Sequence, residues 1–290
     1  MDVYQFSKVE GFIKTHIRGV SFFWATKAIA CSPLVYNAGL VIIEQGNKVG
    51  YLGDRVFHYD SDHYLVLSVP LTFECETNAS LDNPLLGIFI ELDLAELHKM
   101  VMQLSKHNAL DNFELTSPLC GVEPVALDSQ MRKATTRLMQ ALCSEQDSEI
   151  LGLSLVREVV YRALLGKHGP ALYALTQHNS HYARIARSIE IIRREYQKPL
   201  TIKQLAKEVD MSVSAFHRSF KQITEKSPLQ YLKEYRLHKA KSLILHNNIS
   251  VGTAALNVGY ESTSQFSREF KRYFNFLPSQ ARDSGYAQLV

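Results

Sequence analysis

Two stretches near the carboxyl end of the sequence repeat one another at a separation of 50 residues, and this repeat constrains the fold more than any other feature. When residues 212–221 are aligned with residues 262–271, six of the ten positions are identical. Two further identities at the same separation pair Pro228 with Pro278 and Gln230 with Gln280. Such a duplication indicates that the region around both stretches uses one supersecondary unit twice.

Each copy has the pattern of a short helix, a tight turn and a second helix. The short helices are predicted over residues 205–209 and 254–258, and turns that begin at Asp210 and Gly259 follow them. Both turn residues tolerate a left-handed backbone, glycine because it lacks a Cβ and aspartate as one of the few other residues that do. The aligned serine at the start of each second helix is a residue suited to capping it.

The second helix of each copy separates an apolar face from a polar one. Phe216 and Phe220 are four residues apart, like Phe266 and Phe270, and each pair therefore lies on one helix face. Small polar and basic residues occupy the other positions. This arrangement is typical of a helix-turn-helix, in which the second helix reads DNA. Two ordinary helical hairpins with solvated basic faces are the alternative, which the repeated serine, arginine and lysine positions disfavour.

The duplicated region resembles the DNA-binding domain of the AraC/XylS family of bacterial transcription regulators. The resemblance covers roughly residues 182–285, and residues 258–278 are its most specific part. It implies two helix-turn-helix motifs, at about 201–224 and 250–274, joined by a long helix and inserted into successive major-groove segments on one face of DNA. Two residues depart from the family pattern, where isoleucine and glycine are common: Ala254 and Asp210.

Motif position assigns DNA contacts to the two second helices, which are expected to lie about one DNA turn apart, roughly 34 Å. The residues predicted to read bases are Ser214, His217 and Arg218 in the first copy and Thr263, Ser264, Ser267 and Arg268 in the second. Arginine favours guanine because its guanidinium matches the O6 and N7 acceptors. Lys221 and Lys271 lie further along each helix and are predicted to contact phosphates, which gives affinity that depends on salt and little on sequence.

The charge of the chain is divided between its two parts. Residues 182–290 hold 18 Lys+Arg against 9 Asp+Glu, a balance of +9, whereas residues 1–181 hold 14 against 20, a balance of −6. The two balances add to the net charge of +3 of the whole chain. A basic part fused to an acidic one indicates that double-stranded DNA binds at the carboxyl end and not to the first domain.

Residues 33–92 consist of short runs rich in β-branched and aromatic residues, separated by turn formers such as Gly46-Asn47. Many short strands at regular spacing predict an all-β barrel or jelly roll. This part is similar, with less specific motifs, to the cupin-like domain that one branch of the AraC family carries as an effector sensor.

Helical periodicity follows the strands, over residues 93–106, 128–144 and 150–166. In related regulators a helix beyond the barrel pairs with its copy in a second subunit, and the helix over 128–144 is a candidate for this role in a homodimer. The alternative is that its apolar stripe packs on the barrel.

The expected fold is therefore α+β and multidomain, with a cupin-like β-barrel and flanking helices followed by an all-α domain with two helix-turn-helix motifs joined by a long helix. The predicted domains are residues 1–170 for effector sensing and dimerisation, 171–181 as a linker and 182–290 for DNA binding. Aromatic residues on inward-facing alternate positions are predicted to line an effector pocket, namely Tyr36, Tyr51, Phe57 and Tyr64. The alternative is that these rings fill the core and leave no cavity.

A cupin likeness raises the question of a metal site, for which His58, Asp60, Asp62 and His63 are the nearest candidates. The two histidines are expected on different strands with a polar turn between them and no common face, so turn polarity is the better explanation, and neither a metal nor another cofactor is expected. The four cysteines lack the CxxC spacing of metal sites. Residues 1–20 show no signal-peptide pattern and no apolar run is long enough to span a bilayer, which predicts a cytoplasmic protein.

We expect a transcription regulator, an activator or a repressor, that binds double-stranded DNA in response to a small-molecule effector, and not an enzyme. A homodimer is expected, RNA polymerase is a further candidate partner, and no membrane association is expected. Two alternatives stay open. One is a constitutive DNA-binding regulator whose first domain only dimerises, and the other is a metal-dependent cupin enzyme with an appended DNA-binding domain.

Overall fold

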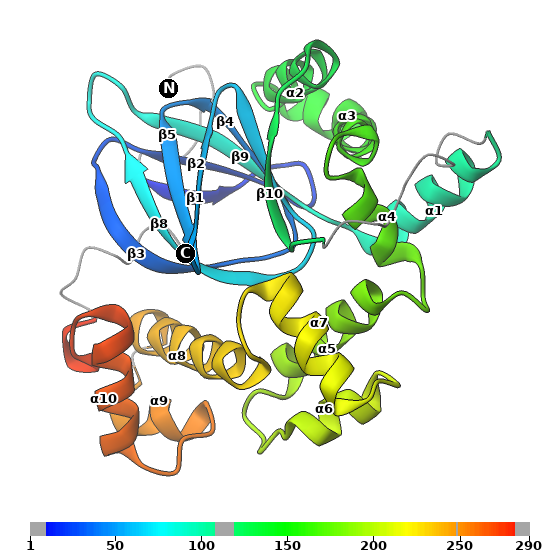
Figure 1. Ribbon diagram of the computed structural model, residues 1–290. Helices are drawn as coiled ribbons and strands as arrows, with labels where there is room; N and C mark the ends of the chain where they lie inside the picture. The colour runs from blue at the N-terminus through cyan, green and yellow to red at the C-terminus, as the bar shows by residue number, and fades with distance from the viewer. Residues whose placement is uncertain (1–9, 108–118, 248, 282–290) are drawn as a thin grey trace.

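The computed structural model describes residues 10–107, 119–247 and 249–281, and Figure 1 shows a curled sheet followed by a helical carboxyl-terminal part. The strands are β1 (Gly11–Lys14), β2 (Val20–Ala25), β3 (Ile29–Tyr36), β4 (Gly39–Gln45), β5 (Asn47–Leu52), β6 (Arg55–Asp60), β7 (His63–Leu67), β8 (Leu71–Asn78), β9 (Leu85–Glu91) and β10 (Val122–Ala126). The helices are α1 (Leu94–Ser105), α2 (Ser129–Ala141), α3 (Glu145–Leu165), α4 (Gly169–Thr176), α5 (His181–Glu195), α6 (Ile202–Glu208), α7 (Val213–Thr224), α8 (Pro228–His246), α9 (Val251–Asn257) and α10 (Thr263–Phe274).

The ten strands form one antiparallel sheet in the order β1-β2-β9-β4-β7-β6-β5-β8-β3, with β10 added to β7. The outer strands β1 and β3 lie at opposite ends of this order and do not pair with each other. The sheet is therefore a half-barrel with an open side. This confirms the predicted fold class, a strand-rich first part with helices and an all-helical second part.

Both faces of the sheet are covered, and β7 shows how its side chains divide. Leu65 and Leu67 lie in the core inside the half-barrel, whereas Tyr64 and Val66 belong to a second core between the sheet and helices α1–α4. Because neighbouring residues of a strand point to opposite faces, a strand covered on both sides is apolar at every position.

Helix α2 packs on the sheet through the apolar stripe that the sequence shows. Met131, Ala134 and Leu138 are all buried there, together with residues of α3. This apolar stripe is thus buried against the sheet and α3 of the same chain, and it is not available to pair with a second copy. The most exposed apolar residues of this helical layer lie instead on α3, where Ile150 is 74% and Leu153 is 65% exposed.

The two halves of the chain are connected through α4 and a short loop over residues 177–180. The side chains of Ala171 and Leu172 in α4 are buried, so the segment around the proposed domain boundary is packed. The inner core of the sheet continues without a break into the helical part, where Val69 and Leu71 share one cluster with Ile223 of α7. Within the described ranges, no helix combines the length and the apolar character needed to cross a membrane.

Candidate nucleic-acid interface

The first helix-turn-helix consists of α6 and α7, and local hydrogen bonds determine where each helix begins. The Thr201 hydroxyl accepts the Gln204 backbone N–H at 3.2 Å, while Gln204 Oε1 accepts the Thr201 N–H at 3.0 Å, which makes a capping box for α6. Ser212 caps α7 by accepting the Ala215 N–H at 3.3 Å. Between the helices Asp210 has a φ of 53°, the left-handed conformation that this turn requires.

The second helix-turn-helix, α9 and α10, repeats this construction with a turn one residue longer. Ser250 and Ser262 cap the two helices by accepting backbone N–H groups at 3.1 and 3.2 Å. In the turn Gly259 has a φ of 86°, and a Cβ at this position would lie 2.6 Å from the backbone oxygen of Gln197. Glycine is therefore favoured at residue 259 by backbone conformation and by space.

The second helix of each motif, α7 or α10, is called its reading helix, and each reading helix has one buried face and one exposed face. Its two core phenylalanines are fully buried, Phe216 and Phe220 in α7 and Phe266 and Phe270 in α10. Eight of the nine residues predicted to contact DNA are exposed, namely Ser214, His217, Arg218, Lys221, Thr263, Ser264, Arg268 and Lys271, and the ninth, Ser267, is half-buried. The structure thus gathers the predicted contacts on the outer faces of two equivalent helices.

Both reading helices point their carboxyl ends toward the sheet and their amino ends away from it (Figure 1). At the end of α7 the Ile223 carbonyl accepts the Gly121 N–H at 2.8 Å, and α10 contacts β3. The amino-terminal halves, which carry Ser214 and Thr263, are thereby left free of the sheet. A helix-turn-helix uses this part of its second helix in the major groove.

Helix α8 joins the two motifs and is bonded to its neighbours along its length. The Arg236 guanidinium donates to the carbonyl oxygens of Tyr196, Lys198 and Gly259 at 2.6, 2.8 and 3.3 Å. Lys233 pairs with Glu269 of α10 at 3.1 Å. These contacts hold the turn of the second motif and its reading helix in a set position relative to α8.

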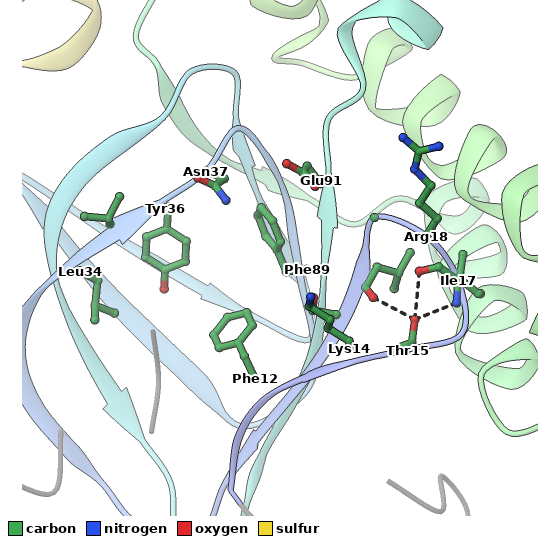
Figure 2. Close-up of a pocket in the computed structure, with 14 residues that line it drawn as sticks. Phe12, Lys14, Thr15, Ile17, Arg18, Leu34, Tyr36, Asn37, Phe89 and Glu91 are labelled. Atoms are coloured by element: carbon green, nitrogen blue, oxygen red, sulfur yellow. Dashed lines mark hydrogen bonds between the residues drawn. The ribbon is translucent and has the colours of Figure 1, made fainter. Parts of the chain in front are cut away.

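A cavity of about 500 Å³ opens between the outer strands β1 and β3 of the half-barrel (Figure 2). Its wall includes the apolar side chains of Phe12, Leu34 and Phe89, and charged residues including Lys14, Arg18 and Glu91 also line it. The volume lies within the range of about 300 to 1,000 Å³ that is usual for small-molecule sites. The unpaired edges of the sheet therefore leave room for a ligand.

The four aromatic residues predicted to line an effector pocket lie in different places. Tyr36 lines the cavity, and Phe57 lies in the same inner core, where its ring packs against Phe73. Tyr51 is half-buried and donates its hydroxyl to Glu76 at 3.2 Å, and Tyr64 lies on the helix-covered face of the sheet. Phe12 is not among the predicted lining residues, because β1 and β2 precede residues 33–92, the stretch whose pattern predicts strands. The apolar run over residues 20–25 is the signal that could have revealed these strands.

In the described part of the chain, no three His, Cys, Asp or Glu side chains lie close enough together to hold a metal ion. Asp60 instead closes the turn between β6 and β7, where its carboxylate accepts the N–H groups of Asp62 and His63 at 2.9 and 3.0 Å. Partial burial raises the pKa of Asp60, but these hydrogen bonds outweigh it and hold the pKa below its usual value.

Comparison with known proteins identifies both halves. The family described as the AraC-type transcriptional regulator N-terminus matches residues 16–171, and a helix-turn-helix domain family matches residues 205–284. The lactose operon transcription activator of Staphylococcus xylosus is 27% identical over 146 residues, which cover 50% of this chain and 51% of that protein. The transcriptional activator RhaS of Klebsiella pneumoniae is 28% identical over 144 residues, with 50% of each chain covered. The chain thus spans about half the length of these relatives.

A solved structure of ToxT from Vibrio cholerae has the same overall fold. It superposes with a TM-score of 0.57 at 12% identity and covers 91% of this chain and 97% of its own. The first family match alone covers more than half of the chain, and the second contains α7, α8, α9 and α10. The chain therefore belongs to the AraC-type transcriptional regulators, a family of DNA-binding proteins and not of enzymes.

Proposed function

We propose that this chain is a sequence-specific regulator whose half-barrel binds a small-molecule effector and passes the effect of binding to the DNA-reading helices. The observation that carries this proposal is a contact shared by the two sites. Asn37 lies in the cavity wall, and its side-chain oxygen accepts a hydrogen bond from Arg193 of α5 at 2.7 Å. A ligand in the cavity would therefore be one residue away from the first helix of the DNA-binding part.

A second route runs through β8, the strand that pairs with β3 of the cavity wall. The Thr72 hydroxyl donates to Glu234 of α8 at 2.6 Å and accepts from Lys226 at 3.0 Å. Glu234 also pairs with Lys226 and accepts the Tyr273 hydroxyl of α10 at 3.3 Å. One buried carboxylate thus contacts the half-barrel, the segment after the first reading helix and the second reading helix. A shift of β8 would therefore move a carboxylate that contacts both motifs.

On the DNA side, the equivalent positions of Arg218 and Arg268 support a role in reading guanine, with the neighbouring serine, histidine and threonine side chains contacting adjacent bases. Lys221 and Lys271, one turn further along, are suited to contacts with the phosphate backbone. A bacterial regulator of this kind acts in the cytoplasm, where the chromosome lies, and RNA polymerase is its candidate protein partner.

A homodimer would use α3, since the stripe of α2 is buried. Ile150 and Leu153 are three residues apart on α3 and lie on one exposed face. A second copy of the same helix would cover both. Sedimentation of the full chain tests this assignment, because Ile150→Glu with Leu153→Glu should yield a monomer. A dimer that persists in the double variant would mean that another surface joins the subunits.

Selection of binding sites from random duplex DNA by the full chain tests DNA reading. The expected result is one enriched site with two conserved segments about 10 to 11 base pairs apart from centre to centre. Enrichment of no sequence at all would contradict sequence-specific reading, and a single conserved segment would show that one motif does not read.

A thermal-shift screen of small molecules followed by gel shifts tests effector sensing. A compound that raises the melting temperature is expected to change the affinity for the selected DNA site. Arg193→Ala should keep the thermal shift and lose most of the change in DNA affinity, because it removes the contact with Asn37 from outside the cavity. Arg194→Ala is the matched control, since Arg194 pairs with Glu195 within α5. A full response in Arg193→Ala would rule out this route, and a screen without any stabilising compound would favour the constitutive dimerising regulator.

A further inference from the structure

Two arginines, each on the helix that precedes a motif, bond to equivalent points of the two turns. Arg184 of α5 donates to the carbonyl oxygen of Asp210 at 2.6 Å, and Arg236 of α8 donates to that of Gly259 at 3.3 Å. Asp210 and Gly259 are the turn residues that have a left-handed backbone. The same contact therefore occurs in both motifs, although it comes from different helices.

Each arginine comes from the helix on which its own motif packs. In Figure 1 α6 and α7 lie beside α5, and α9 lies beside α8. Arg184 and Arg236 are both half-buried, so their guanidinium groups lie at the edge of these contacts. A guanidinium keeps its charge and makes strong hydrogen bonds. The carboxyl end of α6 or α9, where the turn begins, carries a partial negative charge that favours a cation.

The two turns adjoin the amino ends of the reading helices, the ends that enter the major groove. Asp210 lies three residues before α7 begins at Val213, and Gly259 lies four residues before α10 begins at Thr263. The sheet contacts both reading helices at their carboxyl ends and leaves the amino ends free. A helix held at one end can still tilt about that end, so each amino end needs an anchor of its own.

We propose that Arg184 and Arg236 are positioning residues for DNA reading, each of which fixes the amino end of its own reading helix by holding the turn before it. Arg184 acts on α7, and Arg236 acts on α10. This inference rests on the proposed function, because it names residues that determine how well each motif reads its bases.

The expected loss on removing an arginine concerns base preference and is confined to one motif. Hydrogen bonds to base edges depend on distance and angle, so a reading helix whose amino end is not held makes them poorly. Contacts with phosphates tolerate a small shift better, because they depend mainly on charge. A variant without the arginine should therefore still bind DNA but distinguish bases poorly in one of the two segments of the site.

Binding isotherms of the full chain on the selected DNA site, and on single-base variants of both of its segments, test the inference. Arg184→Met should lower the preference for the selected bases about tenfold in the same segment as Arg218→Ala and leave the other segment unchanged. Arg236→Met should do the same in the segment that Arg268→Ala affects. A general loss of stability would lower the affinity without dividing the two segments in this way.

Arg187→Met is the matched control, because Arg187 is exposed on α5 one turn after Arg184 and its substitution removes the same charge. It should keep the base preference in both segments. The slope of the logarithm of the binding constant against the logarithm of the salt concentration is a second measurement. This slope should be the same in Arg184→Met as in the wild type, since loss of a direct phosphate contact would lower its magnitude by about one.

The two substitutions differ in how much they disturb the fold. Arg236 also donates to the carbonyl oxygens of Tyr196 and Lys198, so Arg236→Met removes the donor of three carbonyls and is the more disruptive of the two. Arg184→Met removes the bond to Asp210, and circular dichroism should show a folded protein. If Arg236→Met does not fold, the effect of Arg184→Met on its segment decides the question.

Three results for Arg184→Met would overturn the inference and leave sequence-specific reading intact: an unchanged preference in both segments, an equal loss in both, or a loss only in the segment that Arg268→Ala affects. A lower salt slope with unchanged preference would also overturn it, because Arg184 would then contact a phosphate. A wild-type protein that prefers no sequence would overturn the proposed function and this inference with it.

Discussion

Replacing Gly259 by alanine is expected to lower the free energy of unfolding by about 2 to 4 kcal/mol, from two separate effects. A residue with a Cβ in the left-handed region, where Gly259 has a φ of 86°, costs about 1 to 2 kcal/mol. The new methyl group would lie 2.6 Å from the Gln197 carbonyl oxygen and 3.0 Å from the Arg236 guanidinium, and relieving this overlap costs about 1 to 2 kcal/mol more. Urea denaturation of the full chain, followed by far-ultraviolet circular dichroism, measures the change.

Gly252 provides a matched control in the same motif. It lies in α9, and a Cβ at this position would meet no other heavy atom within 4 Å. Alanine favours helix over glycine, so Gly252→Ala should leave stability unchanged or raise it by up to about 1 kcal/mol. DNA binding should weaken in Gly259→Ala alone, because the turn positions α10. Equal effects of the two substitutions on stability would refute the argument that residue 259 requires glycine.

Three further predictions concern DNA reading, pH and the domain contact. Arg268→Ala should cost about 1 to 3 kcal/mol of binding free energy and relax the preference at one base pair. Lys271→Ala should instead weaken binding to all sequences, and the slope of the logarithm of the binding constant against the logarithm of the salt concentration should fall in magnitude by about one. Binding isotherms on single-base variants at several salt concentrations check this. If Arg268→Ala lost the same affinity for every sequence, the expectation that α10 lies in the major groove would be wrong. Burial lowers the pKa of His168 to about 4 from 6.5, so its contribution to stability is complete above pH 6.5 and is lost as the pH falls from 6.5 to 4, by up to about 3 kcal/mol. Denaturation over this range should show a flatter pH dependence in His168→Gln, and an unchanged slope would contradict the assignment. Glu234→Ala should destabilise by about 3 kcal/mol because it leaves the largely buried Lys226 unpaired, and the double variant with Lys226→Met should recover most of this loss. A double-mutant cycle with additive effects would show that the two side chains do not interact.

The helix-turn-helix pair could be predicted from sequence because its determinants are local. Ser212 and Ser262 each cap a helix through a backbone N–H three residues further on. The core phenylalanines follow one helical turn apart and are all buried. Hydrophobic spacing and capping within about fifteen residues are enough to define such a unit.

The interior of the half-barrel could not be predicted in the same way, because both faces of its sheet are covered. Tyr64 and Leu65 are both fully buried, yet they lie in different cores, and hydropathy does not distinguish them. On β5 the inward positions are Lys48, Gly50 and Leu52, and Tyr51 therefore points the other way. The contact between Thr72 and Glu234 joins residues 162 positions apart, and no local pattern marks it.

The length of α8 has a consequence for the evolution of the operators that the proposed regulator would bind. The helix spans 19 residues, about 28 Å at 1.5 Å per residue, and Arg236 and Lys233 tie it to the second motif. One base pair inserted between the two half-sites would rotate the second by about 34° and move it by about 3.4 Å. An uninterrupted helix cannot twist or bend enough to bring the second motif back into line with its half-site. Insertions and deletions in the spacer of its operators should therefore be eliminated by selection as strictly as substitutions in the bases that are read, while spacer substitutions accumulate freely.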